Sequence, residues 1–120
     1  MLKNFLLVGL GGAVGSMLRY AVTLLFAALQ QSANWATVVV NVIGSFLIGI
    51  LLGTLSPGSL QLLLTVGLCG GFTTFSTYSS QSITLMQNGH VGAGLAYIIG
   101  TVALCLLFVW LGRICSTIRL

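Results

Sequence analysis

The residues of this 120-residue chain that could do chemistry are polar side chains set within apolar stretches. Polar groups are costly in apolar surroundings and usually face a partner, a bundle interior or a water-filled path. Asn41 is the one amide in the strongly apolar run from Val38 to Phe46. Its N–H groups either hydrogen-bond to a neighbouring helix or face a permeating anion. The sequence leaves both interpretations open.

A second polar group follows the adjacent glycines Gly70 and Gly71 and consists mostly of hydroxyl side chains up to Ser82. Adjacent glycines and dense hydroxyls make a poor continuous helix, so the sequence predicts a break here. Broken helices in membranes often build ion sites from freed carbonyl and amide groups. Phe75 and Tyr78 share a helical face after the break, where their positively polarised ring edges either meet an anion or pack against another helix.

Two further features concern the first and last apolar stretches. Tyr97, Thr101 and Cys105 recur at i, i+4 and i+8, which makes one polar-leaning stripe on an apolar helix. This stripe suits an ion path and a polar helix seam equally well. Arg19 has no acidic residue in the chain to neutralise it. Its side chain either snorkels to the interface or lies near a vestibule, where its charge would raise the local anion concentration.

Membrane-spanning helices must position these residues. Only 3% of the residues are charged and 58% are apolar, and the mean hydropathy is +1.16, so no aqueous surface can be built. Four apolar stretches, at 4–29, 35–55, 60–86 and 91–115, reach or exceed the roughly 20 residues that a helix needs to cross hydrocarbon. We expect a single all-α membrane domain over residues 1–120, with four spans and the third helix broken in mid-membrane.

Composition also narrows the function. Four scattered Lys and Arg residues cannot form the basic stripe that nucleic acid requires, so no nucleic-acid partner is expected. A chain of this length suits a small multidrug-type transporter or a small ion channel. Proton-coupled export of cations normally needs an intramembrane carboxylate with a raised pKa, and Asp and Glu number zero. The sequence therefore favours a passive anion channel subunit without catalytic residues; a non-conducting structural subunit stays as an alternative.

The sequence also resembles a known family, the small fluoride channels of bacteria (Fluc), which are also called camphor-resistance or CrcB proteins. The resemblance covers essentially the whole chain. It rests on three motifs in the same order: GGAVGSMLRY at 11–20, VN at 40–41 and GLCGGFTTFSTYS at 67–79. Two positions depart from the family pattern. Tyr78 stands where the family usually has phenylalanine, and Gln81 where it usually has glutamate.

The resemblance implies a fluoride-selective channel that exports fluoride passively across the bacterial plasma (inner) membrane, as an antiparallel dimer with two narrow pores. The pore residues that it implies are Asn41, Phe75, Ser76, Thr77 and Tyr78. It places Tyr97, Thr101 and Cys105 on a polar track and Arg19 toward a vestibule. It further implies a structural sodium ion at the dimer interface, held by the carbonyls of Gly70 and Thr73, since oxygen ligands suit a hard cation.

The cations are unevenly distributed between the two expected sides of the membrane. Lys3, Arg113 and Arg119 lie at the terminal side, whereas the opposite connections, 30–34 and 87–90, contain no Lys or Arg. The positive-inside rule then predicts cytoplasmic termini. Such a bias disfavours insertion of one sequence in both orientations. The partner in the dimer is therefore either a second copy or a homologous subunit of opposite orientation.

Overall fold

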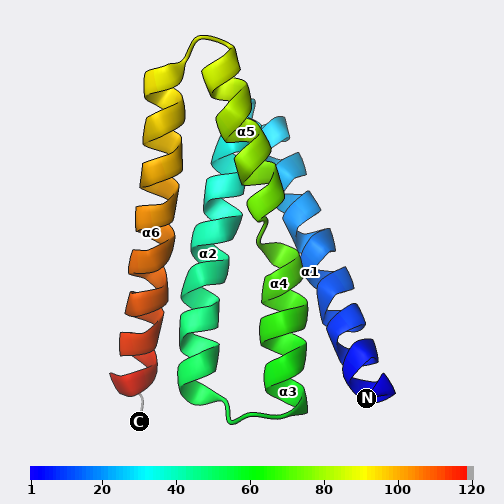
Figure 1. The fold of residues 1–120 in the computed structure, drawn as a ribbon. Helices are drawn as coiled ribbons and strands as arrows, with labels where there is room; N and C mark the ends of the chain where they lie inside the picture. Colours follow the sequence, from blue (N-terminus) through cyan, green and yellow to red (C-terminus); the bar gives the residue numbers. More distant parts are fainter. Residues whose placement is uncertain (119–120) are drawn as a thin grey trace.

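The computed structural model describes residues 1–118, and Arg119 lies outside these described residues. Within this range every regular element is helical (Figure 1). Four helical stretches are long and apolar enough to cross a membrane: Leu2–Ala28, Ala33–Thr54, Ser59–Gln87 and Val91–Ile118. The predicted all-α class and the predicted number of spans are confirmed.

Three of the four spans are continuous helices, α1 (Leu2–Ala28), α2 (Ala33–Thr54) and α6 (Val91–Ile118). Ser32 caps α2, because its Oγ accepts a hydrogen bond from the backbone N of Asn34 at 3.2 Å. The connection before α6 contains Gly89 at φ +85°, a left-handed conformation that glycine adopts without strain.

The third span is divided. It consists of α3 (Ser59–Leu62), the π-helical segment η1 (Leu63–Cys69), α4 (Gly70–Phe72) and α5 (Phe75–Gln87). Thr73 and Thr74 between α4 and α5 are extended, with ψ angles of 158° and 121°. The adjacent glycines themselves are helical, so the interruption comes just after them rather than at them.

The hydroxyl-rich residues after the interruption form a regular helix. Thr74 caps α5 by accepting a hydrogen bond at Oγ1 from the backbone N of Thr77, at 3.3 Å. Ser79 and Ser82 donate their hydroxyls to carbonyls four residues earlier, at 2.9 and 2.7 Å. Because these hydroxyls are satisfied within α5 itself, their density does not prevent helix formation.

The helices pack as two close pairs. α1 lies against η1 and α4, and α2 lies against α6 (Figure 1). In the second pair a Cβ on Gly49 would lie 3.1 Å from the Cα of Gly112, and the rings of Phe46 and Phe108 meet edge to face at 6.2 Å. Small residues allow such close backbone approach. The outward faces expose large apolar side chains, which suits lipid as the solvent.

The chain ends share one side of the bundle. The N-terminus, the connection from α2 to α3 and the C-terminal end of α6 lie at one end of the molecule (Figure 1). The connections from α1 to α2 and from α5 to α6 lie at the other end. Lys3 and Arg113 therefore belong to the same end, as the sequence indicated.

Candidate functional site

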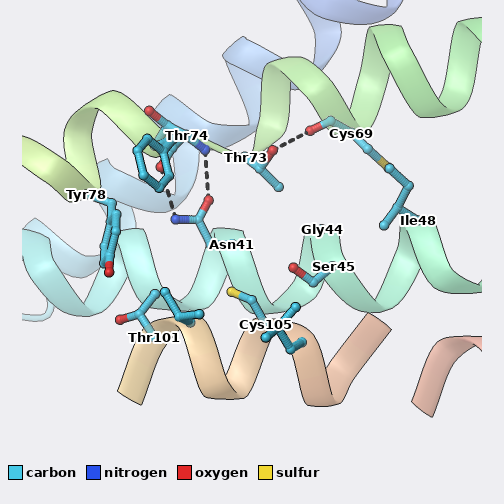
Figure 2. Close-up of a pocket in the computed structure, with 13 residues that line it drawn as sticks. Asn41, Gly44, Ser45, Ile48, Cys69, Thr73, Thr74, Tyr78, Thr101 and Cys105 are labelled. Atoms are coloured by element: carbon cyan, nitrogen blue, oxygen red, sulfur yellow. Dashed lines mark hydrogen bonds between the residues drawn. The ribbon is translucent and has the colours of Figure 1, made fainter. Parts of the chain in front are cut away.

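Asn41 joins α2 to the interruption in the third span. Its Nδ2 donates to the Thr74 carbonyl at 3.0 Å, and its Oδ1 accepts from the Thr74 backbone N at 2.8 Å (Figure 2). One turn later α2 has Gly44, where an added Cβ would overlap Cγ2 of Thr73. The interrupted backbone thus lies directly on α2, and Asn41 gives the Thr74 N–H the acceptor that a continuous helix would have supplied.

The same interruption frees several carbonyls from helical pairing, those of Gly70 and Thr73 among them. In a continuous helix the backbone N of Thr74 would donate to Gly70 O, and that of Thr77 to Thr73 O. Here Thr74 N donates to Asn41 and Thr77 N donates to the Thr74 hydroxyl. Uncharged carbonyl oxygens are suitable ligands for a hard cation. The two carbonyls that the resemblance assigned to sodium, those of Gly70 and Thr73, are therefore among those released from helical pairing, and the residues fit that group.

Three aromatic rings form a row beside the interruption. The Phe75 and Tyr78 rings lie 5.4 Å apart, and the Tyr78 and Tyr97 rings also lie 5.4 Å apart. Tyr78 is 6% exposed, whereas Phe75 is 76% exposed. The row therefore runs from the interior of the bundle, between α5 and α6, to the open face of the protomer.

Both departures from the family pattern take part in hydrogen bonds between α5 and α6. The Tyr78 hydroxyl donates to the Ile98 carbonyl at 2.8 Å. The Tyr97 hydroxyl donates to Oε1 of Gln81 at 2.6 Å. The Tyr78 hydroxyl thus binds the backbone of α6, and the Gln81 amide accepts the bond from Tyr97 without placing a negative charge there.

A cavity of about 350 Å³ lies where α2, the interruption and α6 face one another (Figure 2). Six residues predicted from the sequence line it: Asn41, Thr73, Phe75, Tyr78, Thr101 and Cys105. The ordinary spacing of α6 brings Thr101 and Cys105 to the side that faces Asn41 and α2. The cavity thus gathers the proposed amide, the aromatic pair and most of the polar stripe in one place.

A second cavity of about 420 Å³ lies between the start of α2, the end of α5 and the first half of α6. Tyr97 lines this second cavity, Cys105 lines the first, and Thr101 lines both. The three residues of the polar stripe of α6 therefore all border a cavity, and Thr101 lies where the two cavities adjoin. No Lys, Arg, Asp or Glu is among the described residues that line either cavity.

Four predicted residues line neither cavity: Gly70, whose carbonyl is described above, Ser76, Thr77 and Arg19. Ser76 and Thr77 belong to the cap of α5, where their hydroxyl oxygens lie 3.4 and 3.2 Å from Thr74 Oγ1. The Nε of Arg19 donates to the Gly71 carbonyl at 3.1 Å, and the side chain is half-buried. Arg19 therefore does not extend freely to the interface: it binds the end of α4.

Sequence reasoning missed several residues of the two cavities. Thr74 pairs with Asn41, and the only signal for it was its position as a possible N-cap of α5. Ser45 lines the first cavity. The second cavity is lined, near the connection from α1 to α2, by Ser32, Asn34 and Trp35. Polar residues at helix ends are common, so type and spacing do not distinguish these three.

Comparisons with known proteins cover nearly the whole chain. Residues 6–113 match the family model described as CrcB-like protein, Camphor Resistance (CrcB). A protein of Paramagnetospirillum magneticum named "Fluoride-specific ion channel FluC" is 44% identical, and the match covers 96% of each chain. Proteins of the same name from Thermus thermophilus and Phocaeicola vulgatus are 45% and 42% identical, over 92% of this chain and 93% and 96% of theirs.

The matched region includes the second and third spans, most of the first and fourth, and every predicted site residue. Together with the four apolar helices, the match makes this a multi-pass protein of a bacterial membrane. By its sequence over nearly its full length, the chain belongs to the CrcB-like (Camphor Resistance, CrcB) family.

Proposed function

We propose that this chain is a fluoride channel subunit that lets fluoride leave the cytoplasm passively, and that it is not an enzyme. The observation that carries this proposal is the 44% identity over 96% of both chains to a relative named as a fluoride-specific ion channel. The described geometry supports it, because the two cavities meet along neutral polar residues with no fixed negative charge to repel an anion.

The alternatives fit less well. A multidrug-type transporter would need a carboxylate to hold its proton or its cationic substrate, and the chain has none. A non-conducting structural subunit fits less well with relatives that are named as fluoride-specific ion channels. Passive flow needs neither a nucleotide nor a proton acceptor.

The proposed route follows the polar stripe of α6. Fluoride would pass the ring edges of Phe75 and Tyr78 and the amide of Asn41, and then the hydroxyls of Thr101 and Tyr97. Ring edges carry partial positive charge, and the amide and hydroxyls donate hydrogen bonds. Thr73 lies near the middle of the 29 residues of the third span, which supports a place for the interruption near the bilayer centre.

We further propose an antiparallel dimer with a structural sodium ion at its interface. Phe75 is 76% exposed and Gly70 is also exposed in the single protomer, as residues that meet a partner would be. Two protomers would bring four free carbonyls together, from Gly70 and Thr73 of each. Sodium would supply the positive charge that holds these carbonyls in one place.

The partner is either a second copy or a homologous subunit inserted the other way. Lys3 and Arg113 at one end, against no Lys or Arg in the described connections at the other end, favour cytoplasmic termini for this chain. This bias supports the homologous partner. Tags on both termini, probed from each side of the membrane, test it. Equal populations of both orientations would instead support a homodimer.

Reconstitution into liposomes tests the function itself. Fluoride-selective and chloride-selective electrodes would record efflux from vesicles loaded with both anions, with protein-free vesicles as the control. Fluoride release with chloride retained supports the proposal. Retention of both anions, by the subunit alone and with a homologous partner, would contradict the proposed channel function.

A further inference from the structure

The backbone of α1 fits closely against the first half of the third span. A Cβ added to Gly67 would lie 3.0 Å from the Cα of Gly11, and one added to Gly71 would lie 3.0 Å from the Cα of Gly12. A Cβ on Gly15 would lie 2.8 Å from the backbone N of Phe72. At each of these positions an added Cβ would collide with the opposite backbone, so this close packing of α1 on the third span requires glycine.

This packing places Arg19, one turn after Gly15, at the end of α4. Its Nε donates to the Gly71 carbonyl at 3.1 Å. The carbonyl end of a helix is negatively polarised, and a cation there is stabilising. Within residues 1–118 the Gly71 carbonyl is the one hydrogen-bond acceptor that the structure gives the Arg19 side chain.

We propose that Arg19 is a positioning residue for the interruption in the third span. It holds the carbonyl end of α4 against α1, while Asn41 holds Thr74 against α2 on the other side. Thr73 lies between these two attachments, and Gly70 directly precedes the first. Arg19 therefore acts through the backbone that faces the first cavity, and not by attracting anions from a distance.

A positioning role of Arg19 and a role in attracting anions respond differently to salt. Attraction of anions by an exposed charge is screened as the Debye length falls from about 10 Å at 0.1 M salt to about 3 Å at 1 M. A half-buried hydrogen bond between Arg19 and a carbonyl is screened far less. Fluoride efflux, which rests on the proposed function, should therefore be measured at both salt concentrations for Arg19→Met and Arg19→Lys.

We expect Arg19→Met to slow efflux about tenfold at both salt concentrations, and Arg19→Lys to recover most of the rate, because a cation near the helix end is retained. A deficit of Arg19→Met that disappears at about 1 M salt would overturn the proposal. So would a lysine variant as slow as the methionine variant, since the charge would then not be what holds α4.

A second readout does not depend on efflux. Cys69 is 2% exposed, and its carbonyl accepts both the backbone N and the hydroxyl of Thr73, at 3.0 and 2.9 Å. In a Cys105→Ser, Cys115→Ser background, maleimide labelling of Cys69 reports loosening of this turn. We expect faster labelling with Arg19→Met than with Arg19 or Arg19→Lys.

Arg113→Met is the matched control, because it removes the same charge from an exposed position on α6, away from α4. It should leave the labelling rate of Cys69 unchanged. Equal labelling of Arg19→Met and the parent would refute the positioning role even if the parent conducts fluoride. Absence of efflux from the parent would instead count against the proposed function, and the labelling result would stand by itself.

Discussion

The side chain of Asn41 pairs with the backbone of Thr74 through two hydrogen bonds, one in each direction, at 3.0 and 2.8 Å. An amide side chain therefore completes the backbone pairing at the point where the third span is interrupted. The amide was predicted either to bind a neighbouring helix or to face an anion. One N–H of Nδ2 is used here for the helix, and Asn41 also lines the first cavity.

Asn41→Ala should destabilise the protein and abolish efflux. Both bonds are lost and the Thr74 N and O lose their partner, at a cost of about 2 kcal/mol or more. Thermal unfolding in detergent and fluoride efflux measure the two effects. Asn4→Ala, at an exposed position of α1, is the control and should change neither. An Asn41→Ala variant with parental stability would contradict the pairing.

Tyr78→Phe should conduct fluoride at a rate within about threefold of the parent, because the ring stays and only the bond to Ile98 O is lost. Stability should fall by about 1 kcal/mol, the net value of one hydrogen bond. Tyr78→Ala, which removes the ring, should abolish efflux. If Tyr78→Phe alone stopped efflux, the hydroxyl would have to act on the ion directly.

Thr101→Val should slow efflux about tenfold, because valine has a similar shape but cannot donate a hydrogen bond at the junction of the two cavities. Thr117→Val is the matched control, since Thr117 is exposed near the end of α6. Equal rates for Thr101→Val and the parent would show that the ion does not use this hydroxyl.

Gly15→Ala should cost about 1–3 kcal/mol of stability, the range for inserting a methyl group into filled space, because the added Cβ would overlap Leu68 O. Gly9→Ala lies on the same helix with nothing within 4 Å of an added Cβ, and should be neutral or slightly stabilising. Melting temperatures in detergent compare the two variants. Similar losses for both would argue against the close packing of α1 on the third span.

Removal of sodium tests the proposed metal. With N-methylglucamine in place of sodium, the dimer should dissociate more readily on size-exclusion chromatography and fluoride efflux should slow, because four carbonyls would lose their shared cation. Replacing sodium with potassium is the control: a sodium-selective site loses its effect on the dimer in potassium, whereas a general salt effect does not. Identical dimer stability in sodium, potassium and N-methylglucamine would contradict the proposed sodium site.

Composition and the four apolar stretches were enough to predict four membrane helices, because lipid is the only solvent that suits such a chain. The third span shows where sequence reasoning stopped. Gly70 and Gly71 indicated a weak helix, yet both stay helical, and the missing side chain of Gly71 makes room for α1. Thr73 and Thr74 are extended because Asn41, 33 residues earlier than Thr74, competes for the backbone. Local propensity cannot reveal a partner so distant in the sequence.

Side chains on α6 were the easier part of the site. Thr101 and Cys105 follow ordinary helical periodicity, and the structure brings both to the first cavity. Arg19 was harder, because its interpretation depended on which atom it meets. Arg19 reaches the Gly71 carbonyl only because α1 packs on α4. The motifs that contain Arg19 (11–20) and Gly71 (67–79) do not reveal how these two helices pack.

The bond between Arg19 and Gly71 also bears on how the chain is made. The two residues are 52 positions apart, so α1 leaves the ribosome long before its acceptor is synthesised. A lone arginine near the middle of a membrane helix costs about 2.5–3.5 kcal/mol on insertion scales. We expect α1 to wait at the translocon, with its guanidinium hydrated, until the third span arrives, so that the two helices enter the lipid together.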